Sequence, residues 1–200
     1  MFQSSPMVLP RWEWRAFAAS LPELRHRLAG VKVETVREIQ ETYLLCQRSS
    51  HNAKIRNGVM DLKWRKQVDN QGLELWDPIL KSGFPCEAKA IAQLFGAWTL
   101  PMPTLNRRAY TLEQFLQEVI DPHEDLKSLD VCKVREGFTF EGTTCEFAQI
   151  TAAGDTFESF CVEHEDPQLV MNVLGRLGLD GRQNINYPQA LKRALKQRAA

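Results

Sequence analysis

The chain has 200 residues and a mass of 22.9 kDa, and 44% of its residues are hydrophobic and 25% charged. This composition is typical of a globular protein and excludes a disordered or fibrous one. Lys plus Arg number 25 and Asp plus Glu number 25, so the formal net charge is zero. Any anion binding must therefore come from local placement of charge rather than from a whole-molecule field.

The N-terminus lacks a basic segment followed by an apolar core, and no apolar run reaches membrane-spanning length. The cysteines are odd in number, far apart and without a C-x-x-C pair, which argues against a disulfide framework and a thiolate zinc site. They are Cys46, Cys86, Cys132, Cys145 and Cys161. We therefore expect a cytoplasmic protein without membrane contact, whose thiols are reduced and mostly buried.

The first half of the chain is expected to be rich in strands. Residues 1–10 read as a flexible tail, and Arg11–Phe17 then alternates charged and aromatic residues, as a half-buried strand does. A short helix follows between Ser20 and Gly30. Further strands are expected at residues 31–46, 51–58, 59–68 and 73–76, with a hairpin turn at Asn57-Gly58.

The second half mixes helices and strands. Helical spacing of apolar residues predicts helices near residues 86–95 and 112–119, and strands are expected at residues 131–140, 143–151 and 156–165. Two more helices are expected, from Asp166-Pro167 to Gly178 and from Pro188 behind an Asn186 cap. About eight strands and five helices without a linker indicate one α+β domain over residues 1–200.

Charged side chains recur on one face of each predicted strand, because residues i and i+2 share a face. Trp12 and Trp14, for example, fall opposite the charged residues of the first strand. The basic residues that would share one surface of the sheet are Arg15, Lys54, Arg56, Lys63, Arg65, Lys133 and Arg135. The simpler interpretation of any single strand is a sheet with one face on the core and the other in water.

If the sheet is long and strongly curved, its charged face becomes the inside of an antiparallel, closed or nearly closed barrel flanked by helices. Like charges about 6 Å apart repel by roughly 3 kcal/mol at an effective dielectric near 20, so a basic lining needs anions. Carboxylates supply part of the compensation: Glu13, Asp61, Glu146, Glu163 and Glu165. The remaining positive charge favours a polyphosphate ligand, since Arg and Lys both suit phosphate oxygens.

The spacing Glu163-x-Glu165, with Glu13 on another strand, also suits a hard divalent cation whose shell phosphate oxygens complete. In the alternative interpretation these glutamates simply form ion pairs with Arg15 or Lys133.

The chain resembles the CYTH family, the triphosphate tunnel metalloenzymes, which include thiamine triphosphatases, inorganic triphosphatases and one class of adenylate cyclase. The similarity covers most of the chain in short motifs. Glu13-Trp-Arg15 resembles the end of the E-x-E-x-K signature, and Glu41-Thr-Tyr43 the acidic strand that follows. The remaining motifs are Asn52-Ala-Lys54-Ile-Arg56, Leu62-Lys63-Trp-Arg65, Lys133-Val-Arg135, Cys145-Glu146-Phe-Ala, Glu163-His-Glu165, Leu177-Gly-Leu179 and Asn186-Tyr187-Pro188.

The resemblance implies a tunnel in which the basic side chains grip a triphosphate and carboxylates hold Mg²⁺ or Mn²⁺. It implies metal ligands at Glu13, Glu146, Glu163 and Glu165, a phosphate contact from Arg15, and catalytic roles for Glu13, Arg15 and Glu165. The expected activity is metal-dependent hydrolysis of inorganic triphosphate, thiamine triphosphate or a nucleoside triphosphate. The signature has glutamate where this chain has Arg11 and lysine where it has Arg15, so a non-catalytic polyphosphate-binding protein with a degraded metal site is the alternative.

The sequence leaves nucleic-acid binding and the oligomeric state open. Trp14, Trp64 and Trp76 could stack bases in a nucleic-acid-binding barrel, although zero net charge and aromatics opposite the basic residues argue against nucleic acid. Assembly as a homodimer is left open. The trailing cations Lys192, Arg193, Lys196 and Arg198 are interpreted as a solvated face of the last helix.

Overall fold

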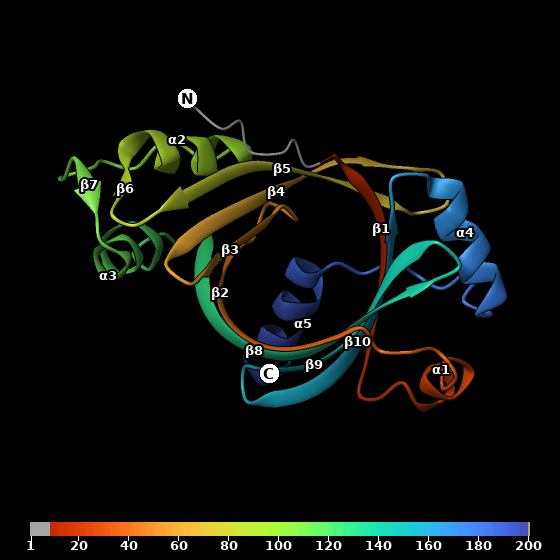
Figure 1. Cartoon of the computed structure of the whole chain (residues 1–200). Helices are drawn as coiled ribbons and strands as arrows, with labels where there is room; N and C mark the ends of the chain where they lie inside the picture. The colour runs from red at the N-terminus through yellow and green to blue at the C-terminus, as the bar shows by residue number, and fades with distance from the viewer. Residues whose placement is uncertain (1–8, 200) are drawn as a thin grey trace, which may run out of the picture.

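Eight antiparallel strands form a closed ring in the computed structural model, which describes the backbone of residues 9–199 and the side chains of residues 9–197 (Figure 1). Their order around the ring is β1-β10-β9-β8-β2-β3-β4-β5. The strands are β1 (Arg11–Ala18), β2 (Thr35–Cys46), β3 (Asn52–Arg56), β4 (Val59–Val68), β5 (Glu74–Gly83), β8 (Leu126–Phe140), β9 (Thr143–Ala152) and β10 (Asp155–His164). The predicted α+β barrel is confirmed. Of the tail predicted at residues 1–10, residues 1–8 lie outside the described part.

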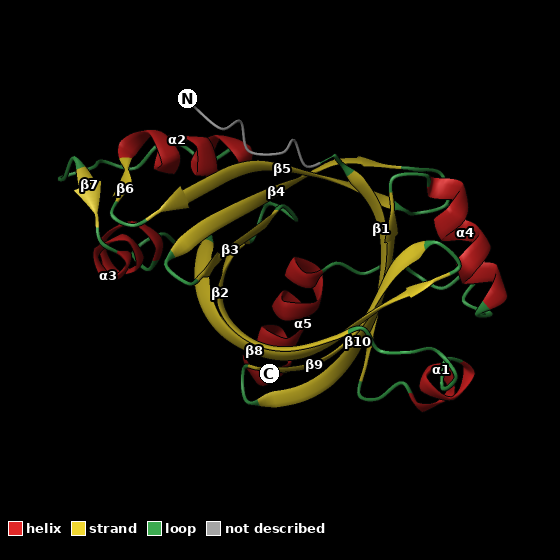
Figure 2. Ribbon diagram, in the orientation of Figure 1, coloured by secondary structure: helices red, strands yellow, loops and turns green. Residues whose placement is uncertain are grey.

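Helices surround the ring, and one lies within its outline (Figure 2). The helices are α1 (Pro22–Arg27), α2 (Ala88–Ala97), α3 (Leu112–Phe115) with the π-helical turn η1 (Leu116–Ile120), α4 (Pro167–Arg176) and α5 (Tyr187–Ala199). A separate two-stranded sheet joins β6 (Cys86–Glu87) to β7 (Ala109–Tyr110). None of these helices is both long and apolar enough to cross a bilayer.

The ring closes through a short ladder between β1 and β5, in which Glu13 lies opposite Glu74 and Arg11 opposite Trp76. The strand predicted at residues 73–76 was too short, because β5 continues to Gly83. Register shifts in its pairing with β4, next to Pro78, break the alternation that sequence patterns detect. The predicted hairpin at Asn57-Gly58 is confirmed, with φ of 50° and 69° as a primed turn requires.

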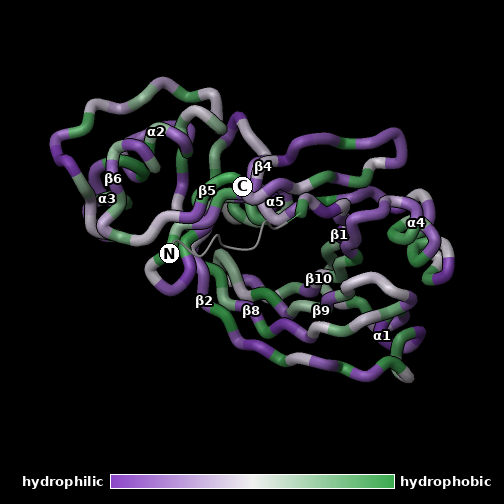
Figure 3. The backbone as a smooth tube through the Cα atoms, turned by 45° about the horizontal axis from the view of Figure 1, so that its top comes forward, coloured by the Kyte–Doolittle hydropathy of each residue, from purple (hydrophilic) through white to green (hydrophobic). Residues whose placement is uncertain are grey.

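Alternation along the strands creates two chemically different surfaces of the ring, and Figure 3 shows hydrophilic and hydrophobic segments alternating along the chain. The outer surface of β3 and β4 packs Ala53, Ile55 and Leu62 against α2 and α3. The outer surface of β1 and β10 packs Trp14 and Val162 against α1 and α4. Each fully buried side chain of this kind stabilises the fold by about 1.5–3 kcal/mol, so these helices hold the curved sheet.

Helix α5 lies inside the ring (Figure 1). Its Tyr187 and Leu191 are buried against the inward-facing Tyr43, Val131 and Ile150. The predicted solvated face of this helix is confirmed for Arg193 and Lys196, which are exposed, while its apolar side chains pack against the few apolar positions of the inner face. The Arg198 side chain of that prediction lies outside the described part.

The tryptophans predicted as stacking residues do not share one surface. Trp14 is buried in the outer core, Trp64 is 43% exposed on the opposite face to the basic residues, and Trp76 is buried on the inner face. All of the cysteines are free, and Cys132 alone among them is exposed. The prediction that the thiols are unpaired and mostly buried is confirmed.

Candidate anion site inside the ring

The predicted basic residues lie on the inner face of the ring. Cross-strand pairing aligns Lys54 with Asp61 and with Tyr43, and Arg15 with Cys161. The other basic residues share this face by the alternation of their strands: Arg56, Lys63, Arg65, Lys133 and Arg135. The sequence pattern therefore brought together side chains from β1, β3, β4 and β8.

Glu41 is the centre of one ion-pair cluster and has a side chain that is only 1% exposed. Its Oε1 accepts a hydrogen bond from Lys54 Nζ at 2.7 Å, and its Oε2 accepts one from Lys133 Nζ at 2.6 Å. Lys133 Nζ also donates to Tyr43 Oη at 2.7 Å. The carboxylate thus holds two lysines from different strands at one point of the interior.

The cluster perturbs the acidity of its members. Burial alone would raise the pKa of Glu41, but the charges of Lys133 and Lys54 outweigh it and lower that pKa to about 2. Burial and the charge of Lys54 lower the pKa of Lys133 from 10.5 to about 7, although Glu41 opposes this. A further anion nearby would therefore stabilise the charged form of Lys133.

A second cluster forms around Glu146, between Arg15 and Arg135. Arg15 Nη1 lies 3.3 Å from Glu146 Oε1, and Arg135 Nε donates to Glu146 Oε2 at 2.6 Å. Although burial raises the pKa of Glu146, the two guanidinium groups lower it overall. Both oxygens of this carboxylate are thus engaged by arginine.

Arg15 is fixed from several sides. Its Nε donates to Glu13 Oε1 at 3.0 Å and its Nη1 to Ser159 Oγ at 3.1 Å. The Tyr187 ring of α5 lies 4.6 Å from the guanidinium carbon, and the same ring lies 3.8 Å from Lys133 Nζ. Helix α5 therefore completes the interior and contacts both clusters.

A third pair lies near the seam where the ring closes. Arg65 Nη1 is 2.8 Å from Glu74 Oε1, which also accepts a hydrogen bond from Asn186 Nδ2 at 2.9 Å. Burial raises the pKa of Glu74 despite these partners. Asn186 additionally caps α5, since its Oδ1 accepts from Gln189 N, as its sequence position predicted.

Two inner-face cations have weak compensation or none. Arg56 is 35% exposed, and its contacts to Glu41 and Asp61 are 3.6 and 3.9 Å long. Among the described residues, no carboxylate lies within ion-pair distance of Lys63. These side chains, on the adjacent strands β3 and β4, remain available to an anion in the ring.

The carboxylates predicted as metal ligands differ in their surroundings. Glu13 and Glu163 lie directly opposite one another on β1 and β10. Glu163 contacts only the exposed Arg11, at 3.3 Å, among the described ion pairs. Glu165 is exposed beyond the end of β10, while Glu146 is held by arginines.

Facing carboxylates repel, so a cation between Glu13 and Glu163 would relieve their repulsion. Mg²⁺ commonly binds through one or two carboxylates, with phosphate oxygens and water completing its shell. The Glu13–Glu163 pair could supply two such carboxylates, each of which has an arginine partner: Arg15 for Glu13 and Arg11 for Glu163. Within the part of the chain that the structure describes, no group of three Asp, Glu, His or Cys side chains forms a fuller ligand set.

Sequence reasoning missed two buried carboxylates as members of the charge balance, Glu41 and Glu74. Both alternate with outward-facing residues on their strands, so period-two alternation could have assigned them to the inner face. The aromatic contribution of Tyr187 was also missed, because it depends on where α5 packs and no local pattern reports that position.

The protein belongs to a class of folds in which antiparallel strands close into a ring. Ion-paired basic side chains line the inside of this ring. The PH1012 protein from Pyrococcus horikoshii OT3 is similar, with a TM-score of 0.52 and 17% identity over 90% of this chain and 98% of that chain. This likeness shows the fold.

Two other solved structures align less well. A candidate adenylate cyclase from Bacillus halodurans has a TM-score of 0.49 and 14% identity, covering 89% of this chain and 95% of that one. HpAC1 from Hippeastrum, a candidate adenylyl cyclase described as having a dominant triphosphatase activity, has a TM-score of 0.43 and 12% identity, covering 85% and 88%. No protein-family model matches the chain, and no curated protein matches it significantly.

Proposed function

We propose that this chain binds a small-molecule triphosphate inside the ring and hydrolyses it with Mg²⁺ or Mn²⁺. The observation that carries the proposal is the inner face itself, where cations from several strands converge and Arg56 and Lys63 lack close carboxylate partners. A chain of phosphoryl groups presents several negative charges in a line, which matches cations distributed along adjacent strands.

The basic residues divide by their surroundings. Lys54, Arg56, Lys63 and Arg65 lie on β3 and β4, and we expect them to hold one side of the triphosphate. Arg15, Lys133 and Arg135 come from β1 and β8 and would contact further oxygens of the triphosphate, with Lys133 beside Lys54 at Glu41. Because Lys133 has a lowered pKa, phosphate oxygens nearby would favour its protonated form.

Glu13 and Glu163 would hold the divalent cation, with Glu165 available at the strand end. When bound, the ion would neutralise charge on the phosphoryl oxygens and lower the pKa of a bound water. Arg15 keeps its charge, so its role would be to stabilise developing negative charge rather than to remove a proton. Glu146 would serve chiefly to position Arg15 and Arg135.

The alternative is a protein that binds triphosphate without turnover. It is favoured by one specific observation: Arg15 contacts Glu13 and Glu146 together, which places a built-in cation beside the carboxylates of the expected metal site.

Phosphate release from inorganic triphosphate, thiamine triphosphate and ATP, each with Mg²⁺, Mn²⁺ or EDTA, separates these functions. Hydrolysis predicts metal-dependent release that is lost in EDTA. Thermal stabilisation by triphosphate without release supports binding alone. Neither stabilisation nor release would refute both functions.

A further inference from the structure

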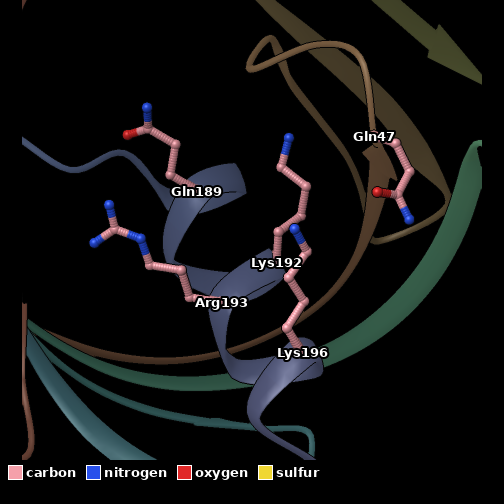
Figure 4. A pocket seen from close by; sticks show the side chains of 5 residues that line it. All are labelled: Gln47, Gln189, Lys192, Arg193 and Lys196. Carbon is pink, nitrogen blue, oxygen red and sulfur yellow. The ribbon is translucent and has the colours of Figure 1, made fainter. Parts of the chain in front are cut away.

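A basic pocket of about 190 Å³ lies between α5 and the segment that follows β2. It is lined by Gln47, Gln189, Lys192, Arg193 and Lys196. Figure 4 shows the α5 side chains emerging from the helix within the ring, with Gln47 facing them from the neighbouring chain segment. The pocket therefore has two walls that come from distant parts of the sequence.

Lys192 fixes these walls relative to one another. Its Nζ donates to the carbonyl oxygens of Cys46 at 3.1 Å and Ser49 at 2.8 Å. The ammonium group thus ties α5 to the β2–β3 connection. An anion entering the pocket would meet side chains on an anchored helix rather than on a free surface.

Within residues 9–197, no carboxylate compensates the positive charge of this pocket. Among the described residues, no carboxylate lies within ion-pair distance of Lys192, Arg193 or Lys196, and residues 1–8 contain no Asp or Glu. Lys192 and Lys196 are four residues apart on one helix, a spacing at which like charges destabilise the helix. Burial, Lys196 and Arg65 also lower the pKa of Lys192.

Benefit from the dipole at the C-terminal end of α5 accounts for single cations there. It does not account for their convergence on Gln47 and Gln189 around a pocket. Arginine supplies a planar pair of donors, the lysines supply point charges, and the glutamine amides supply further donors. Together these groups match a small, highly charged oxyanion.

We propose that this pocket binds a phosphate-class dianion through Gln47 and side chains of α5, none of which belongs to the strand residues proposed to hold the triphosphate. The inference does not depend on hydrolysis within the ring. The same chemistry could come from free phosphate or from a phosphoryl group of the ring ligand, since Gln189 also lines an adjoining pocket that contains Arg65 and Glu74.

Calorimetric titration with inorganic phosphate tests the site. Arg193→Gln and Lys196→Gln should each weaken phosphate binding about tenfold, because each removes a charge-assisted contact. Lys66→Gln is the matched control, since Lys66 is exposed and only loosely paired with Asp77 at 3.8 Å. Lys54→Gln is the ring variant, and its phosphate affinity reports any binding by the strand residues.

Circular dichroism establishes that each variant is folded before titration. Three results would overturn the proposal: no saturable phosphate binding by the wild-type protein, an equal loss in Lys66→Gln, or a loss confined to Lys54→Gln. Failure of the triphosphate proposal gives another result: the wild-type protein binds phosphate but does not bind triphosphate.

Triphosphate titrations with and without saturating phosphate identify the source of the anion. Unchanged triphosphate affinity, in the wild-type protein and in Arg193→Gln, assigns the pocket to free phosphate. Competition, together with weaker triphosphate binding by Arg193→Gln, assigns it to a phosphoryl group of the ring ligand. Either pattern supports the site.

Discussion

Replacing Glu41 by glutamine tests whether the interior cations depend on an internal carboxylate. The Glu41→Gln substitution keeps the shape of the side chain but leaves Lys54 and Lys133 without their shortest anionic contacts, of 2.7 and 2.6 Å. Removing one partner of a buried ion pair costs about 3–5 kcal/mol. We expect the lower end of this range near neutral pH, because Lys133 can lose its proton.

A loss of about 3 kcal/mol lowers the melting temperature by roughly 6–12 °C for a chain of this size. The assay is urea unfolding of both proteins at pH 7, followed by tryptophan fluorescence. Glu38→Gln is the control on the same strand, because Glu38 is exposed and its replacement should change the free energy of unfolding by less than about 0.5 kcal/mol.

Inorganic triphosphate should restore part of the stability lost in Glu41→Gln, since its oxygens would replace the missing carboxylate as partners of the lysines. The stabilisation by triphosphate should therefore be larger in the variant than in the wild-type protein. A Glu41→Gln protein as stable as Glu38→Gln would refute the assignment of Glu41 as the anion that holds the two lysines.

Three further outcomes are expected. Arg56→Ala should weaken triphosphate binding about tenfold in a thermal-shift titration, whereas Lys66→Ala should not, because only Arg56 lies on the inner face. The wild-type free energy of unfolding should rise from pH 7 toward pH 9 in urea titrations. The unfolded chain binds more protons in this window, since the pKa of Lys133 falls from 10.5 to about 7 on folding; Lys133→Met should lose that rise. Glu163→Gln should weaken Mn²⁺ binding, measured by electron paramagnetic resonance, more than Glu165→Gln does.

Each of these expectations has a contrary result. Equal effects of Arg56→Ala and Lys66→Ala would show that charge at the outer surface suffices. A pH dependence unchanged in Lys133→Met would assign the titration to another group. Equal Mn²⁺ affinity in Glu163→Gln and the wild-type protein would remove β10 from the metal site.

Period-two alternation made the inner face predictable from the sequence. Lys54 and Arg56 alternate with Ala53 and Ile55, and such short-range information is sufficient to assign a side chain to one face of a strand. The sheet curves into a ring with the charged face inside, and helices cover the apolar outer surfaces of the strands. The fold class and the location of the basic residues followed from these local patterns.

Contacts between distant segments could not be predicted in the same way. The pairing of Glu41 with Lys133 depends on the register between β2 and β8, and the position of α5 depends on apolar residues of several strands. A helix rich in lysine and arginine is typical of a solvated surface, so its burial against Tyr43 and Ile150 had no sequence signal. These long-range contacts determine which carboxylates are available to a metal and which form ion pairs with lysine or arginine.

Because α5 follows every strand of the ring along the chain, translation produces it only after the barrel segments have been made. Until then, Arg15 and Lys133 lack the aromatic ring of Tyr187, and Glu74 lacks the amide of Asn186. A nascent or truncated chain that stops before residue 186 would thus expose a ring of incompletely compensated charges.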